Sequence, residues 1–373
     1  MLPAEGSEAT WGESTCQFSD SFSHFRYSIP VKATIAVIGG GAWGTALAAH
    51  SARLGHEVRL WAREDEVVRD VLEHRENRLF LEGIKLPESI TASTDPKVVL
   101  AGADVVLLVP PSAFLRAVTR DTVAPYLPKS AAVAVATKGI ENDTHRLMLE
   151  VVAEVLPDRA AALAALSGPS FAREVALGQP TDVVVATRDD AVAARLADVL
   201  HAPLFRVYTS GDPIGCEVGG AMKNVLAVAA GACDGLGLGT NARAALVTRG
   251  LSEMARLGVA LGADPLTFMG LSGVGDLILT TTGALSRNRS LGLKIAEGVD
   301  PATWLATQRT VAEGYLTAKA AWGLAQEKCV DLPITEQVYH VLHTGRPLLE
   351  AMKALLHRPQ KDELWGIAPR KAW

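Results

Sequence analysis

Short apolar runs of strand length alternate with helical patterns through the first half of the chain. Helical patterns lie between these runs, for example at Thr144–Val155 and Ala191–Leu200. Because strands that alternate with helices form βαβ units, the pattern predicts an α/β fold with a mostly parallel, doubly wound sheet. The predicted strands are Ala33–Ile38, Glu57–Ala62, Asp104–Val109, Ala132–Ala136, Ala162–Leu166, Thr181–Ala186 and Leu204–Tyr208.

Strand signals end at about Gly211, and helical patterns continue from there to about Leu356. A chain of 373 residues is also too long for one ordinary core. We therefore expect a sheet domain over residues 33–211 and an all-helical domain over residues 212–357. Residues 1–32 lack a basic start followed by an apolar stretch, so we predict a disordered extension rather than a signal peptide, and residues 358–373 form a tail.

The composition excludes several classes of partner. The net charge of −5 provides no basic field for nucleic acid or a membrane surface, and no apolar run is long enough to span a membrane. The four cysteines form no CxxC pair, which favours free thiols in the cytoplasm over disulfides or zinc. His and carboxylate residues do not gather at ligand spacing, so no metal is expected.

A glycine-rich turn joins the first predicted strand to the first predicted helix. It reads Gly39-Gly40-Gly41-Ala42-Trp43-Gly44, and the strand–turn–helix context is the one that a dinucleotide-binding GxGxxG motif requires. Gly39 makes the tight turn, Gly41 lets the backbone approach a pyrophosphate, and Gly44 permits close helix packing. The alternative is an ordinary βα turn; the context favours a Rossmann-type domain.

Arg63 directly follows the second predicted strand, Glu57–Ala62. An acidic residue near this point binds the ribose hydroxyl of NAD, whereas an arginine suits the 2′-phosphate of NADP. Arg63 therefore favours NADPH, although Glu64 and Asp65 follow directly and are able to serve a ribose, and Arg63 is also compatible with a solvated role.

A long apolar helix is predicted from Cys216 to Gly239. Lys223 and Asp234 are its only charged residues from Val218 onward, and Asn224 follows the lysine. Burial disfavours a charged lysine and lowers its pKa, which is a property of functional lysines. The alternative is a core helix whose lysine reaches the solvent.

Four further segments carry candidate chemistry. Lys138 follows a predicted strand, where ligands of doubly wound sheets bind, and it is otherwise a surface lysine. Ser170 is a candidate contact or only a helix cap. Asp276, in a glycine-rich turn, is a candidate partner for the lysine, and the later Ser286–Arg289 is a phosphate clamp or a solvated loop.

The chain resembles the bacterial NAD(P)-dependent sn-glycerol-3-phosphate dehydrogenases. The resemblance covers about residues 33–345 and keeps the order of the family's motifs. Several of the motifs are long and specific, so the match does not rest on the glycine turn. The matching stretches are IAVIGGGAWGTALA, VPPSAF, ATKGIE, SGPSFAREV, GCEVGGAMKNVLAVAAG, LSGVGDLILT, SRNRSLG and VAEGYLTA.

The resemblance implies a Rossmann-type domain followed by a helical domain like the C-terminal domain of 6-phosphogluconate dehydrogenase. It implies reduction of dihydroxyacetone phosphate to sn-glycerol 3-phosphate for phospholipid synthesis, in a cytoplasmic homodimer. Lys223 matches the catalytic lysine. The implied substrate contacts are Lys138, Gly168, Ser170, Lys223, Asn224, Asp276, Thr280, Ser286, Arg287 and Asn288. The implied contacts with NADP or NAD are Gly39, Gly41, Ala42, Trp43, Gly44, Arg63, Lys138, Ala172, Arg287, Val311 and Glu313.

These residues suggest a mechanism. An ammonium group stabilises the alkoxide that forms when a ketone is reduced and can donate the proton. We expect Lys223 to act as the acid, with its pKa lowered by burial, Lys138 and Arg287, and held in place by Asp276. Two alternatives remain: a related dehydrogenase of hydroxy acids, such as a ketopantoate reductase or a 3-hydroxyacyl enzyme, and a redox sensor that binds NADPH without turnover.

Overall fold

The structure is a computed structural model that describes residues 32–309, 312–363 and 365–367. These described residues belong to one compact unit. The predicted extension before Lys32, the predicted cofactor contact Val311 and the last residues of the predicted tail lie outside the described residues. In the described part, no helix is both long and apolar enough to cross a membrane.

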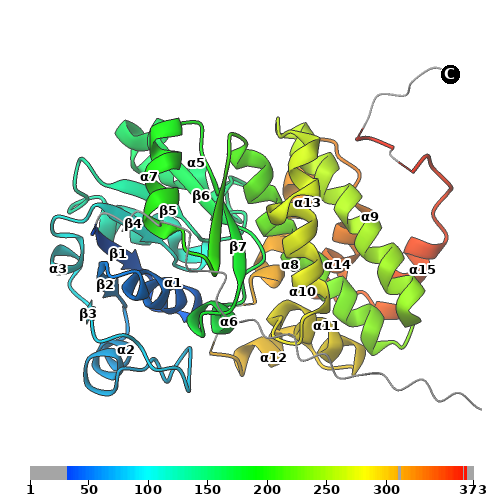
Figure 1. The fold of residues 1–373 in the computed structure, drawn as a ribbon. Helices are drawn as coiled ribbons and strands as arrows, with labels where there is room; N and C mark the ends of the chain where they lie inside the picture. Colours follow the sequence, from blue (N-terminus) through cyan, green and yellow to red (C-terminus); the bar gives the residue numbers. More distant parts are fainter. Residues whose placement is uncertain (1–31, 310–311, 364, 368–373) are drawn as a thin grey trace, which may run out of the picture. The chain divides into compact units, whose positions relative to one another are not determined.

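Eight strands of the described chain form one sheet in the order β3-β2-β1-β4-β5-β6-β7-β8 (Figure 1). Neighbouring strands run parallel except β6 and β7, which are antiparallel. The predicted mostly parallel sheet is therefore confirmed. The strands are β1 (Thr34–Ile38), β2 (Glu57–Trp61), β3 (Ile90–Ser93), β4 (Val105–Leu108), β5 (Ala132–Val135), β6 (Leu163–Ser167), β7 (Thr181–Ala186) and β8 (Phe205–Ser210).

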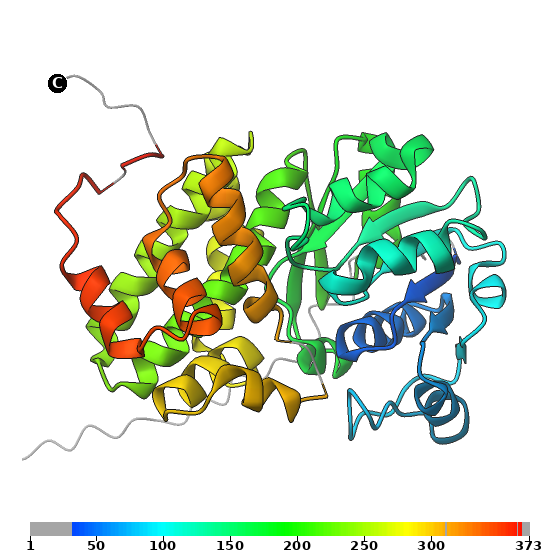
Figure 2. The same cartoon turned by 180° about the vertical axis from the view of Figure 1, so that it is seen from behind.

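Helices cover both faces of the sheet (Figures 1 and 2). Along β1, Ile35 and Val37 belong to one apolar cluster while Ala36 and Ile38 belong to another, because successive side chains of a strand point to opposite faces. Strands buried on both faces read as continuous apolar runs, which is why the sequence revealed them. The helices of this half are α1 (Ala42–Arg53), α2 (Asp65–Arg69), α3 (Pro96–Leu100), α4 (Leu115–Val118), α5 (Met148–Val155), α6 (Ala172–Ala176) and α7 (Asp190–Leu200), with the short turns η1 (Asp70–His74), η2 (Ser112–Phe114), η3 (Thr119–Val123) and η4 (Pro157–Ala162).

Three local predictions were wrong. The edge strand β3 was missed, because it has four residues and alternates between buried and exposed positions. The helix predicted from Thr144 begins only at Met148, since His145 adopts a left-handed backbone with φ 55°. The long apolar helix ends at Gly235 rather than Gly239, because Gly237 has φ 67° and breaks the helix.

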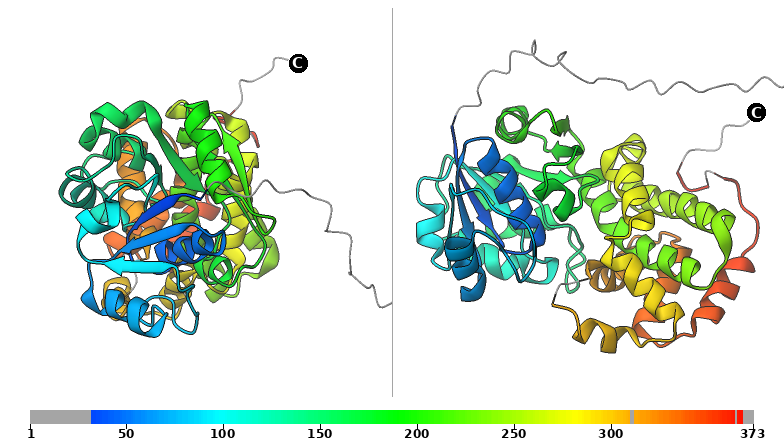
Figure 3. Two further views of the ribbon diagram at one scale, coloured as in Figure 1. Left: turned by 60° about the vertical axis from the view of Figure 1, so that its left-hand side comes forward. Right: turned by 60° about the horizontal axis from the view of Figure 1, so that its bottom comes forward.

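Every element after Ser210 in the described residues is helical, and most of these helices pack against α8 (Pro213–Gly235); Figure 3 shows them from two further sides. Strand β8 ends at Ser210 and α8 begins at Pro213, close to the predicted boundary, although the division into two domains stays a prediction. The remaining elements are α9 (Gly239–Ala260), η5 (Pro265–Met269), η6 (Leu271–Gly275), α10 (Asp276–Thr282), α11 (Arg287–Ala296), α12 (Pro301–Ala306), α13 (Glu313–Glu327), α14 (Pro333–His343) and α15 (Leu348–Leu356).

Small residues let α8 and α11 cross in backbone contact. A Cβ on Gly231 would lie 2.0 Å from the Arg289 carbonyl oxygen, and a Cβ on Gly292 would lie 2.0 Å from the Val228 carbonyl oxygen. Only glycine fits at either position. The crossing fixes the start of α11, and with it the Ser286–Arg289 segment, against the helix that carries Lys223.

Candidate active site

A buried carboxylate lies between two lysines where the sheet and the helices meet. Lys223 Nζ on α8 donates to Asp276 Oδ1 at 2.5 Å, and Lys138 Nζ, in the loop after β5, donates to Asp276 Oδ2 at 2.7 Å. The Asp276 side chain is 0% exposed, whereas those of Lys223 and Lys138 are 11% and 15% exposed. The predicted pairing of Lys223 with Asp276 is present, and Lys138 joins it.

Close backbone packing places Asp276 beside α8. A Cβ on Gly219 would lie 2.2 Å from the Ser272 carbonyl oxygen, so α8 and the π-helical turn η6 touch through glycine. Asp276 follows this turn as the first residue of α10. The Thr280 hydroxyl donates to the Asp276 carbonyl at 2.7 Å and lies 3.3 Å from Oδ1, which fixes the carboxylate.

The three charges determine the protonation of the centre. Burial lowers the pKa of Lys223 from 10.5 to about 8; Asp276 acts to raise it and Lys138 lowers it further. Burial acts to raise the pKa of Asp276, but the two ammonium groups lower it below its ordinary value. The aspartate is therefore ionised, and Lys223 exchanges its proton close to neutral pH.

Lys138 is also held by the loop after β6. Its Nζ donates to the Gly168 carbonyl at 3.0 Å, and the Ser170 hydroxyl donates to the same oxygen at 3.0 Å. Gly168 has φ 120°, and a Cβ there would lie 3.0 Å from Val183 Cα, so only glycine is suitable. Ser170 does not cap α6: the N-cap residue is Phe171, which has no side-chain cap.

Two buried asparagines link the lysine helix to its neighbours. Asn288 Nδ2 donates to Asn224 Oδ1 at 2.9 Å, and Asn288 Oδ1 accepts from the Gly314 N–H at 2.9 Å. These two hydrogen bonds connect α8, α11 and α13. Ser286 caps α11 by accepting from the Arg289 N–H at 3.2 Å, so the solvated-loop alternative for this segment is wrong.

The two arginines of this segment have different surroundings. Arg287 is exposed in the first turn of α11 and interacts electrostatically with Glu313. Arg289 instead forms an ion pair with Asp234, with Nη2 at 2.7 Å from Oδ2. Arg287 is therefore the arginine available to a phosphate group, and Arg289 is part of the packing of α8 against α11.

The glycine turn after β1 has the features that a dinucleotide needs. Gly39 has φ 124°, and a Cβ on Gly44 would lie 1.9 Å from the Gly39 carbonyl oxygen. The position of a Cβ on Gly41 is open space, and α1 starts after this residue without a side-chain cap for the N–H groups of its first turn. Trp43 Nε1 is buried without a hydrogen-bond partner. These groups fit a bound dinucleotide phosphate.

Arg63 follows β2 at the same edge of the sheet as the glycine turn. Its side chain is 73% exposed, Nη2 donates to Glu64 Oε1 at 3.1 Å, and the guanidinium lies 5.8 Å from the centre of the Phe114 ring. Arg63 is therefore solvated but oriented, with a carboxylate neighbour that is itself able to bind a ribose.

Glu313 at the start of α13 binds the loop after β4. Its carboxylate accepts from the Ser112 N–H at 2.9 Å and from the Ser112 hydroxyl at 2.5 Å. Burial raises the pKa of Glu313, while Ser112 and Arg287 act to lower it. Ser112 belongs to the matching stretch VPPSAF, but its contact with Glu313 spans 201 residues and left no local signal. The predicted contact Ala172 is the first residue of α6.

Comparisons with known proteins agree with this geometry. The family model described as NAD-dependent glycerol-3-phosphate dehydrogenase N-terminus matches residues 34–193, and the corresponding C-terminus model matches residues 212–353. The chain is 50% identical over 332 residues to the glycerol-3-phosphate dehydrogenase (NAD(P)+) of Geobacter sulfurreducens, which covers 89% of this chain and 99% of the relative.

Solved structures give the same result. The glycerol-3-phosphate dehydrogenase of Coxiella burnetii is 40% identical with a TM-score of 0.84, over 88% of this chain and 99% of that one. A ketopantoate reductase from Ralstonia eutropha is 22% identical with a TM-score of 0.55, over 86% of this chain and 99% of that one, and shares the fold alone. The hydroxy-acid alternative therefore has no support beyond the fold.

Proposed function

The chain belongs to the NAD-dependent glycerol-3-phosphate dehydrogenase family and interconverts dihydroxyacetone phosphate and sn-glycerol 3-phosphate with NAD(P); we propose that Lys223 transfers the proton of this reaction. The observation that carries this proposal is the buried centre in which Lys223 and Lys138 share Asp276. The nicotinamide, when bound, exchanges a hydride with the carbon that bears the reacting oxygen.

Lys223 serves both directions because of its protonation. In reduction, its ammonium group donates a proton to the oxygen that becomes the alkoxide and is left as a neutral amine. In oxidation, the neutral amine accepts the hydroxyl proton. A pKa of about 8 allows both forms near neutral pH, which is the condition for general acid–base catalysis.

Asp276 and Lys138 orient and charge the centre. Asp276 keeps the two ammonium groups together in a buried site where they would otherwise repel each other. Lys138 is held in position by both Asp276 and the Gly168 carbonyl, and from there its amino group polarises the carbonyl oxygen. Gly168, Ser170 and Thr280 complete this part of the substrate site.

The start of α11 binds the phosphate in this proposal. Arg287 is exposed there, and guanidinium groups match the geometry of phosphate oxygens. Asn288 gives one amide hydrogen to Asn224 and keeps a second for the substrate. Ser286 holds the turn as its cap.

The glycine turn, Arg63 and Glu313 would hold the cofactor. The open space at Gly41 and the unpartnered Trp43 Nε1 support a pyrophosphate at the start of α1. We propose a preference for NADPH from the exposed guanidinium of Arg63. A homodimer, a cytoplasmic location and a supply of product to phospholipid synthesis stay predictions from the family.

Replacement of Lys223 by Ala tests the proton role. Loss of a positioned acid lowers turnover by about 10²–10⁴-fold. The part of the pH dependence of turnover that arises from titration of Lys223 disappears as well. Consumption of NADPH with dihydroxyacetone phosphate, unphosphorylated dihydroxyacetone or ketopantoate is followed by absorbance, with exposed Lys129→Ala as control. Near-wild-type turnover of Lys223→Ala, with unchanged pH dependence, contradicts the assignment.

Replacement of Arg63 by Ala tests the cofactor preference. A guanidinium that binds the 2′-phosphate contributes only to NADPH, so the KM for NADPH rises while that for NADH stays constant. The neighbouring Glu64→Gln variant reports whether the carboxylate serves the ribose of NADH instead. Equal changes in both KM values would remove Arg63 as the discriminating residue.

A further inference from the structure

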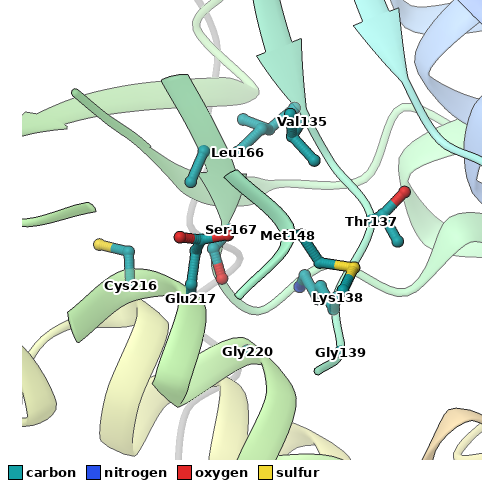
Figure 4. A pocket seen from close by; sticks show the side chains of 11 residues that line it. Val135, Thr137, Lys138, Gly139, Met148, Leu166, Ser167, Cys216, Glu217 and Gly220 are labelled. Atoms are coloured by element: carbon teal, nitrogen blue, oxygen red, sulfur yellow. The ribbon is translucent and has the colours of Figure 1, made fainter. Parts of the chain in front are cut away.

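A small cavity lies against the loop that carries Lys138. It is enclosed by α8, the carboxyl ends of β5 and β6, and the start of α5, and its polar lining includes Thr137, Lys138, Ser167 and Glu217 (Figure 4). The space open to the centre of a water molecule is about 10 Å³, which is room for a single water.

Two polar groups face this cavity with unused hydrogen-bonding capacity. The Ser167 hydroxyl is buried, 4% exposed, and has no partner. Glu217 is also buried; its Oε1 accepts from the Leu149 N–H at 2.7 Å, and the Met148 N–H interacts with the same carboxyl group. Buried polar groups are nearly always satisfied by protein or by ordered water. The geometry therefore indicates a water between Ser167 and Glu217.

Glu217 connects the two lysine-bearing segments. It lies on α8 six residues before Lys223, and it binds the second residue of α5, where the loop that carries Lys138 ends. Between Glu217 and Lys223, Gly220 lets Lys138 and Ser167 approach the helix: a Cβ there would lie 3.0 Å from Ser167 Oγ and 3.4 Å from Lys138 Cγ.

We propose that Glu217, with one water held against Ser167, is a positioning residue that sets the placement of Lys138 relative to Lys223 around Asp276. This inference rests on the proposed roles of the two lysines. Glu217 gives the start of α5 a side-chain hydrogen bond to α8, so loss of the carboxyl group lets this end of the loop shift. A displacement of about 1 Å at a reacting group costs about 10²-fold in rate.

The charges around Glu217 define its state. Burial raises the pKa of Glu217 to about 8, the N–H groups of Leu149 and Met148 act to lower it, and Glu150 on α5 raises it. Lys138 faces the same cavity from its loop, and the Cys216 thiol is the neighbour on α8. At neutral pH the carboxyl group is therefore largely protonated, so it accepts from Leu149 and donates to the water.

Glu217→Leu, compared with Glu253→Leu, tests the proposal. Glu253 is an equally buried carboxyl group that accepts from backbone N–H groups at the start of α14, away from the lysines. We expect Glu217→Leu to lower kcat by about 10–100-fold. We also expect it to move the midpoint, which is the pH at which kcat for reduction has fallen by half as pH rises. Glu253→Leu lowers the Tm but keeps the kcat and the midpoint of the folded enzyme.

A conservative variant and a crystal structure complete the test. Glu217→Gln preserves the shape and hydrogen bonds of the protonated side chain, so it restores both kcat and midpoint. A high-resolution crystal structure of the wild type shows one water at Ser167. Three results would overturn the proposal. Glu217→Leu could keep the wild-type kcat and pH midpoint, or both leucine variants could lose activity only in proportion to their unfolded fraction. The third such result is a cavity that contains no water.

The outcomes separate this proposal from the function it rests on. If the wild type fails to reduce dihydroxyacetone phosphate, or if Lys223→Ala is fully active, the proposed function itself fails. If the wild type is active and Lys223→Ala is not, while Glu217→Leu behaves as the wild type, only the positioning role of Glu217 is wrong.

Discussion

Replacing Asp276 by Asn removes the negative charge between two ammonium groups and keeps the shape of the side chain. In the wild type, Lys223 and Lys138 lie 2.5 and 2.7 Å from the two oxygens of this fully buried carboxylate. Without the charge, the repulsion between the two lysines is uncompensated. Lys223, whose pKa burial has already lowered to about 8, then releases its proton more readily.

The size of this change follows from the geometry. A unit charge at about 4 Å, in an environment with an effective dielectric constant of about 20, contributes about 4 kcal/mol, which corresponds to about three pH units. Opposite charges within hydrogen-bonding reach shift pKa values in proteins by about one to three units. We therefore expect the midpoint that belongs to Lys223 to fall by about one to three pH units in Asp276→Asn.

The same shift to lower pH affects the two reactions differently. Reduction requires the protonated lysine, so its rate declines as pH rises through the midpoint, and the decline begins at lower pH in the variant. Oxidation requires the neutral amine, so its rate rises through the same midpoint, and that rise also moves to lower pH. A general loss of activity would lower both rates without moving either midpoint.

The assay measures kcat against pH in both directions by the absorbance of the reduced cofactor. Asp121→Asn is the matched control, because Asp121 is an exposed carboxylate whose partner Arg120 is also exposed. Circular dichroism or thermal melting confirms that the variant is folded at each pH. An Asp276→Asn enzyme that keeps the wild-type midpoints would refute the electrostatic role of this centre.

Two predictions concern stability. Burial raises the pKa of Glu253 from 4.5 to about 7, so its contribution is fully present below pH 4.5 and is lost as pH rises toward about 7. In Glu253→Gln the unfolding free energy from urea titration therefore changes less over this window than in the wild type or in the exposed Glu350→Gln control. Gly231→Ala places a Cβ 2.0 Å from the Arg289 carbonyl oxygen and is expected to cost about 1–3 kcal/mol or more. Gly211→Ala, where a Cβ meets open space, is the control, and equal urea midpoints for the two would show that the crossing of α8 and α11 adapts freely.

The sequence by itself determined the elements that local patterns encode. The central strands are apolar on both faces, so β1 and β4 are visible as continuous runs, and the glycine turn after β1 is recognisable from its spacing. Lys223 was identified because a charged side chain is unfavourable in an apolar helix unless it has a function there. Motifs of the family then supplied partners that no local rule contains.

Tertiary structure alone decided which of these residues meet. Lys138 and Asp276 are 138 residues apart, and Ser112 and Glu313 are 201 residues apart, so no periodicity in the chain relates them. The reversed direction of β7 beside β6 also depends on packing that one strand does not specify. Glu217 gave no signal for the same reason: its carboxyl group acquires a role only when α5 and β6 fold against α8 and enclose it. Burial and charge proximity, which shift the pKa values at this site, are properties of the assembled elements.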